Sequence, residues 1–236
     1  MGLFDETIRN VNDWLERKRG AGEVREFEVA PSNWPREKSI ILKADMQMEL
    51  GNPLQNSLSL LVWSDDGSGP ARDEVLLIGP DLAEAASDAL PLARLVIIRG
   101  DFADEYESYR QLLEASYDLD LRGVTSRSLP SRQEIWLRIS HDAMREGLSL
   151  QTMGNALIEQ LKPLDSVEAV QVVYVTSSRE DLGELRPVAE RARTIVEALV
   201  KMYDEMNFDC EECEYEEVCD EVGELRMIHE RLKGSN

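Results

Sequence analysis

The stretch VEAVQVVYVT, residues 167–176, carries the strongest strand signal of the chain. Valine and threonine branch at Cβ, which suits a pleated strand better than a helix. Immediately before it, Ser149 is placed to cap a helix that runs to Lys162 and stops at Pro163. After it, residues 179–206 have the pattern of a long helix with Pro187 inside. The strand at residues 167–176 is therefore expected to lie between two helices in the chain.

Upstream of this strand, short strand and helix patterns alternate. The fully apolar run LARLVIIR (92–99) predicts a buried strand, and EIWLRIS (134–140) predicts a strand with Trp136 and Arg138 on one face. Residues 122–133 are interpreted as a loop, and Ser140 as the cap of a helix that ends at Gly147. The remaining predictions are helices at 3–19, 82–89 and 103–115 and extended segments at 24–29, 39–42, 57–63 and 75–78.

The alternation of strands and helices predicts a mixed α/β fold, an open sheet with flanking helices in one or two α/β units. We divide the 236 residues into four parts. These are an N-terminal helix and extended segment (1–35), a first α/β unit (36–121), a second α/β unit (122–206) and an acidic, cysteine-containing segment (207–236).

Charge excludes several partners. The formal net charge is −21, and nucleic acids or anionic membranes require concentrated Lys and Arg. No segment has the apolar length of a membrane span, and residues 1–10 lack the pattern of a secretory signal, so we expect a cytoplasmic protein. Residues 204–224 hold eleven carboxylates and no base, which is typical either of a solvated face or of a docking surface for a basic partner.

All three cysteines of the chain, Cys210, Cys213 and Cys219, lie in that acidic segment with the spacing C-x2-C-x5-C. Three soft sulfur ligands at one point are what an iron–sulfur cluster or a zinc ion needs. His229 is a candidate fourth ligand for zinc. The remaining alternative is that this cysteine-containing segment binds no metal.

A group of basic residues stands near an aromatic one. Arg122, Arg127, Arg132 and Arg138 flank Trp136 in an otherwise acidic chain. Arginines beside an aromatic face can hold the phosphates and the base of a nucleotide-like ligand. The alternative is that these arginines pair with the surplus carboxylates.

Seven segments in this order resemble acetyl-CoA synthase, the nickel–iron–sulfur subunit of the carbon monoxide dehydrogenase/acetyl-CoA synthase complex. They are MQMELGNP (46–53), EVLLIGPDLAEA (74–85), LARLVIIRG (92–100), EIWLRIS (134–140), GNALIEQL (154–161), VEAVQVVYVT (167–176) and the cysteine run. The resemblance covers roughly residues 40–220 and corresponds to the middle domain and the start of the catalytic domain.

The resemblance implies a [4Fe–4S] cluster on Cys210, Cys213 and Cys219, with zinc as the alternative, and a coenzyme A site at Trp136, Arg138, Arg132 and Arg127. The family's fourth cluster cysteine and its Cys-Gly-Cys motif do not occur up to Asn236, so nickel is not expected. We therefore expect a truncated relative that does not make acetyl-CoA alone.

We consider three functions. The first is an accessory iron–sulfur protein of anaerobic one-carbon or corrinoid metabolism, partnered by a corrinoid protein, a methyltransferase or a component of the same complex. The second is a metal-free interaction module with an acidic docking segment. The third is an enzyme whose active site is completed by a second subunit.

Overall fold

The strand β9 (Val167–Val175) is the middle strand of a five-stranded sheet in the computed structural model, which describes residues 2–65, 67–117 and 119–204. The neighbours of β9 are β4 (Glu74–Ile78), which runs parallel to it, and β6 (Leu92–Gly100), which runs antiparallel. The outer strands are β1 (Val24–Glu28), antiparallel to β4, and β3 (Ser57–Ser64), parallel to β6. The mixed α/β fold is thus confirmed.

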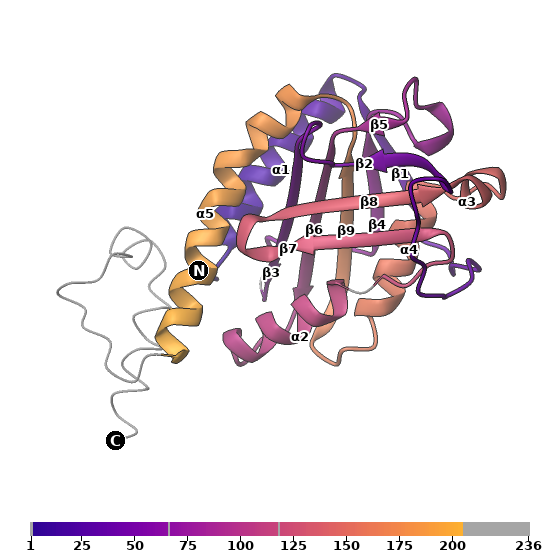
Figure 1. The fold of residues 1–236 in the computed structure, drawn as a ribbon. Coiled ribbons are helices and arrows are strands. Elements are labelled where there is room, and N and C mark those ends of the chain that lie inside the picture. Colours follow the sequence, from indigo (N-terminus) through magenta and orange to yellow (C-terminus); the bar gives the residue numbers. More distant parts are fainter. Residues whose placement is uncertain (1, 66, 118, 205–236) are drawn as a thin grey trace, which may run out of the picture.

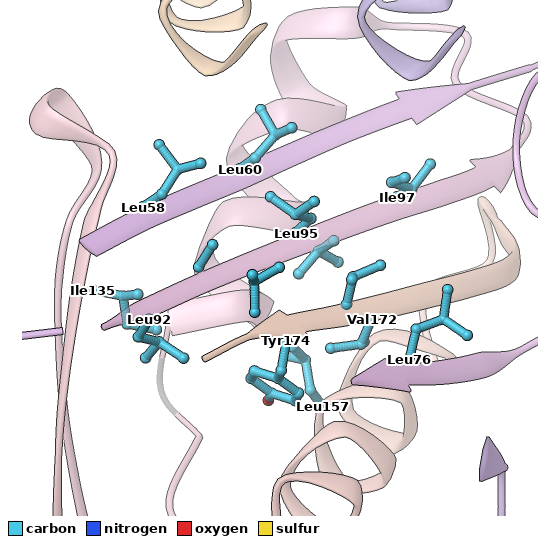
Figure 2. Close-up of a cluster of buried hydrophobic side chains, with 14 of the residues drawn as sticks. Leu58, Leu60, Leu76, Leu92, Leu95, Ile97, Ile135, Leu157, Val172 and Tyr174 are labelled. Carbon is cyan, nitrogen blue, oxygen red and sulfur yellow. The ribbon is translucent and has the colours of Figure 1, made fainter. Parts of the chain in front are cut away.

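Burial on both faces explains the composition of β9. Val172 and Tyr174 on one face and Val173 and Val175 on the other have no exposed surface. A strand covered on both sides lacks the alternation of a half-exposed strand and becomes a continuous apolar run. Figure 2 shows the side chains of this sheet, with Tyr174 directed toward the helix below it.

Helices cover the two faces of the sheet. On the face of Tyr174, α4 (Leu150–Leu161) packs on β4 and β9, and α2 (Glu105–Tyr117) packs on α4. Leu58, Leu60, Leu95 and Ile97 point to the opposite face (Figure 2). The helices α1 (Asp5–Gly20) and α5 (Arg179–Asp204) pack on each other and on β3. The short α3 (His141–Arg145) is capped by the hydroxyl of Ser140, as predicted.

A second sheet has four strands, in the order β5 (Ala89–Leu90), β2 (Met46–Leu50), β8 (Glu134–Ser140) and β7 (Val124–Leu129). Figure 1 shows its strands running across those of the larger sheet. Two hydrogen bonds join the sheets: Ser59 N donates to Gln133 O at 2.6 Å, and Ile135 N donates to Ser57 Oγ at 3.3 Å. The second sheet therefore starts beside the first residues of β3.

Three predictions of local structure are wrong. Residues 122–133 contain the strand β7 and the short 3₁₀ helix η2 (Pro130–Arg132), not a loop alone. Residues 39–42 form no strand, because their backbone bonds to side chains, with Ile41 N donating to Thr125 Oγ1 at 2.7 Å. Residues 82–88 hold only the 3₁₀ turn η1 (Leu82–Glu84), where Asp81 and Glu84 form a capping box, and Ala89 begins β5.

A partly buried ion pair joins α1 to α5. Lys18 Nζ lies 2.5 Å from Asp181 Oδ1, and both side chains are less than one-fifth exposed. The hydrogen bond to Asp181 raises the pKa of Lys18 above its ordinary value. Burial alone would raise the pKa of Asp181, but hydrogen bonds from Lys18, Ser177 and Ser178 outweigh it, so that the pKa of Asp181 is lowered.

The pKa of Asp181 predicts a pH dependence of stability. Because the pKa is lower in the folded state, the contribution of the pair is present above the unfolded value of about 3.9 and is lost as the pH falls through the folded value. We expect Asp181→Asn to lower the free energy of unfolding by about 1.5–3 kcal/mol at pH 7. Urea titrations should show this difference shrinking below about pH 4. An equal difference at pH 3 and pH 7 would contradict the assignment.

Two helical glycines provide a matched test of the packing of α4. A Cβ on Gly154 would lie 2.8 Å from both γ-methyl carbons of Val75 and 3.4 Å from Cε2 of Tyr174, whereas a Cβ on Gly183 of α5 meets no described atom within 4 Å. We expect Gly154→Ala to destabilise the protein by about 1–3 kcal/mol. The control Gly183→Ala should stabilise it by about 0.5–1 kcal/mol. The measurement is urea unfolding, and stabilisation by both changes would argue against this packing.

Candidate arginine and tryptophan site

The outer face of the β7–β8 hairpin carries a basic and aromatic surface. Along β8, Ile135, Leu137 and Ile139 are buried, while Trp136 and Arg138 between them are partly exposed. Arg127 lies directly opposite Trp136 in the antiparallel register of β7. Side chains opposite each other in such a pair share one face of the sheet. The fold therefore places Arg127, Trp136 and Arg138 together, and we name these three residues the arginine–tryptophan cluster.

Cation–π contacts organise this cluster. The guanidinium carbon of Arg138 lies 4.3 Å from the centre of the Trp136 ring, and that of Arg127 lies 5.8 Å from it. Both distances are within the range at which the ring attracts a cation. The indole Nε1 of Trp136 is buried and has no hydrogen-bond partner among the described residues. Within the cluster, Trp136 is therefore contacted through its ring face and not through a hydrogen bond of its N–H.

The two arginines differ in their ion pairs. Arg138 Nε donates to Glu49 Oε1 at 3.0 Å, and the two residues face each other across β8 and β2. No ion pair of Arg127 is present within residues 2–65, 67–117 and 119–204. The expected pairing with surplus carboxylates thus occurs at Arg138. It also occurs at Arg122, which bonds to Glu146 away from the cluster.

Arg132 stands apart from the cluster. It belongs to η2, in the turn that joins β7 to β8, and its side chain is exposed. Within the described residues, the cation–π contacts to Trp136 involve Arg127 and Arg138 alone. The structure brings together three of the four residues that the resemblance implied for coenzyme A.

The predicted metal ligands Cys210, Cys213 and Cys219 lie outside the described residues, as does His229. In the part of the chain that is described, no group of three or more His, Cys, Asp or Glu side chains is arranged to hold a metal ion. The chemistry of the cysteine run itself, three thiols within ten residues, fits a soft metal or an iron–sulfur cluster.

A second basic site was missed from the sequence. Arg94 lies in β6 and lines a cavity of about 420 Å³ between the sheet, α2, α5 and the β7–β8 turn. The residue is 4% exposed. The signal was present, because Arg94 is the one charge inside the apolar run LARLVII. A charge at such a position requires an explanation.

The outer cluster has the chemistry of a nucleotide site. A guanidinium donates two parallel hydrogen bonds to a phosphate, and the face of an indole stacks on a purine. Arg138 and Arg127 present such donors beside Trp136. The fold and this surface define a mixed α/β domain with a cationic, aromatic face.

The comparison with known families agrees with the resemblance in sequence. The chain belongs to the CO dehydrogenase/acetyl-CoA synthase complex beta subunit family, whose model matches residues 34–180. This range contains the arginine–tryptophan cluster and Arg94, and it ends before the cysteines.

Curated relatives carry the name acetyl-CoA decarbonylase/synthase complex subunit beta. The protein of Archaeoglobus fulgidus is 30% identical over 200 residues, which are 80% of this chain and 37% of the relative. Subunit beta 1 of Methanosarcina mazei is 28% identical over 175 residues, covering 73% and 35% of the two chains. The chain thus spans little more than a third of the length of these relatives. In its described part, no helix is long and apolar enough to cross a membrane.

Proposed function

We propose that the chain is an accessory relative of the acetyl-CoA synthase subunit that acts in anaerobic one-carbon or corrinoid metabolism. The observation that carries the proposal is the family match over residues 34–180, which includes the arginine–tryptophan cluster. Because fold alone does not define function, the proposal depends on what the cluster binds. Its role would be to hold a substrate or carrier for a partner that performs the chemistry.

The ligand proposed for the cluster is coenzyme A. Arg127 and Arg138 would hold its phosphates, and Trp136 would stack on its adenine ring. Glu49 competes with the ligand for this site. Its carboxylate pairs with Arg138, with Oε1 of Glu49 3.0 Å from Nε of Arg138, and it would repel an approaching phosphate. Arg132 at the hairpin turn would contribute a further exposed positive charge beside the ligand.

The cofactor proposed for the C-terminal segment is a [4Fe–4S] cluster on Cys210, Cys213 and Cys219. Its support is the donor set, because three clustered thiols supply the ligands that such a cluster uses. Zinc with His229 as fourth ligand is the alternative. A bound cluster would supply electron transfer, and the surrounding carboxylates would disfavour its reduction.

Protein partners are part of the proposal. The relatives named above are subunits of a complex, and the eleven carboxylates of residues 204–224 would suit a basic docking surface. A corrinoid protein, a methyltransferase or another component of such a complex is the kind of partner we propose.

Coenzyme A titration tests the cluster. By calorimetry at low salt, we expect wild type to bind coenzyme A and Arg138→Ala to bind it about tenfold more weakly, because one charge-assisted contact is lost. Glu49→Gln should bind severalfold more tightly, since Arg138 is then released to the phosphates. Arg122→Ala is the matched control, because Arg122 pairs with Glu146 away from Trp136, and its affinity should equal that of wild type. No detectable binding by wild type would remove coenzyme A from the proposal.

Metal analysis tests the cysteines. Protein purified without oxygen should contain about four irons and absorb broadly near about 400 nm, as thiolate-bound cubane clusters do. Cys213→Ser should lose this absorption with little change in the part of the chain that the structure describes. A chain that contains zinc instead would establish the zinc alternative, and one that stays colourless and metal-free after anaerobic reconstitution would favour the metal-free interaction module.

A further inference from the structure

The cavity beside Arg94 has mostly apolar walls. Leu61 and Val96 form its floor on the sheet, Leu113 of α2 and Val196 of α5 form its sides, and the β7–β8 turn closes one end. At about 420 Å³ it is large enough for a small organic molecule, since ligand pockets begin near 300 Å³. Figure 1 shows α2, α5 and the β7–β8 hairpin converging at this end of the sheet.

Arg94 is the buried charged group of the cavity, and like the hydroxyl of Tyr117 it has a polar atom without a hydrogen-bond partner among the described residues. Its neighbours in register are Ser59 on β3 and Tyr174 on β9, and the small side chain of Ser59 leaves space beside it. The guanidinium Nε is buried without a hydrogen-bond partner, and no ion pair of Arg94 exists in the described part of the chain. Most buried polar groups in proteins are paired, so such an arginine requires a counter-charge that is not part of the fold.

The surrounding groups do not supply that charge. Burial raises the pKa of both Tyr174 and Tyr117 to about 12, so both hydroxyls are neutral at pH 7. Glu197 lines the mouth of the cavity, but its carboxylate pairs with Arg193 at 3.5 Å. Burial lowers the pKa of Arg94 as well, yet a guanidinium stays charged at neutral pH.

We propose that this cavity binds an organic carboxylate, with the carboxylate on Arg94 and an apolar body against Leu61, Val96, Leu113 and Val196. A planar carboxylate matches the two-pronged donor geometry of a guanidinium. Arg94 is the deeply buried cation of this cavity, and the charge of one carboxylate balances it. The apolar walls favour a ligand with a hydrocarbon part over a bare inorganic anion.

This site is separate from the arginine–tryptophan cluster. Arg94 belongs to the five-stranded sheet, whereas Trp136 and Arg138 lie on the outer face of the second sheet. The inference does not depend on the binding of coenzyme A or of a metal, and the two sites can be tested independently.

The test uses hexanoate as the probe and the full chain as the protein. By calorimetry at pH 7, we expect hexanoate to bind wild type at least tenfold more tightly than hexanamide, acetate or inorganic phosphate. Hexanamide keeps the hydrocarbon part without the charge, and acetate keeps the charge without the hydrocarbon part. Equal affinity for hexanoate and hexanamide, or no binding of hexanoate, would overturn the proposal.

Substitutions separate a binding role of Arg94 from a structural one. Arg94→Met should abolish hexanoate binding and raise the melting temperature of the ligand-free protein by about 2–4 °C, because an unpaired buried charge is removed. A lower melting temperature would indicate a structural arginine and would contradict the proposal.

Two further variants complete the test. Leu113→Trp fills the cavity while retaining Arg94, and it should also abolish hexanoate binding. This variant tests the site even if Arg94→Met does not fold. Arg110→Met is the control, because Arg110 of α2 pairs with Glu107 and does not line the cavity; its affinity should stay within about threefold of wild type. Hexanoate binding that survives Leu113→Trp would place the ligand elsewhere and overturn the assignment.

Discussion

The burial of β9 on both faces is the constraint on which the structure depends. α4 packs on β9 on the side of Tyr174, and α1 and α5 lie over the opposite face of the sheet, where they pack on β3 (Figures 1 and 2). The neighbours of β9 come from residues 74–78 and 92–100, so the strand closes long loops in the chain and joins early segments to late ones. An unpaired charge buried in such an apolar sheet costs free energy, and Arg94 is therefore an exception that requires an explanation.

The two basic sites of the domain differ in their exposure to solvent, and therefore in the strength of their charge interactions. The arginine–tryptophan cluster faces solvent and shares Arg138 with Glu49, so each contact contributes little and a ligand must displace a competing carboxylate. Arg94 is buried in an apolar cavity, where a single charge pair is strong and an unpaired charge is costly. The first site suits a large, highly charged ligand bound through several contacts. The second suits a small ligand selected by one charge and by shape.

Local signals account for what could be predicted. β6, β8 and β9 carry strong apolar patterns, and Ser140 and Ser149 cap α3 and α4 as expected. β7 was missed because its two serines and Arg127 give no apolar strand pattern, and the strand forms by pairing with β8. The proximity of Trp136 and Arg138 can be predicted from the sequence, because they lie two residues apart on one strand. The proximity of Arg127 to Trp136 depends on the register between β7 and β8, which the sequence alone does not give. Arg94 was overlooked because its significance lies in the cavity built by α2, α5 and the β7–β8 turn, which are distant in the chain.

The central functional claim is that the outer face of the β7–β8 hairpin is the coenzyme-binding surface of a member of the CO dehydrogenase/acetyl-CoA synthase complex beta subunit family. Hydrogen–deuterium exchange with saturating coenzyme A tests it most directly, because it locates the ligand on the chain without substitutions. The account predicts slower exchange in peptides covering residues 124–140 and 46–50, and no change in β6 at residues 92–100. Protection confined to β6 and α2, or no protection along the hairpin, would contradict it.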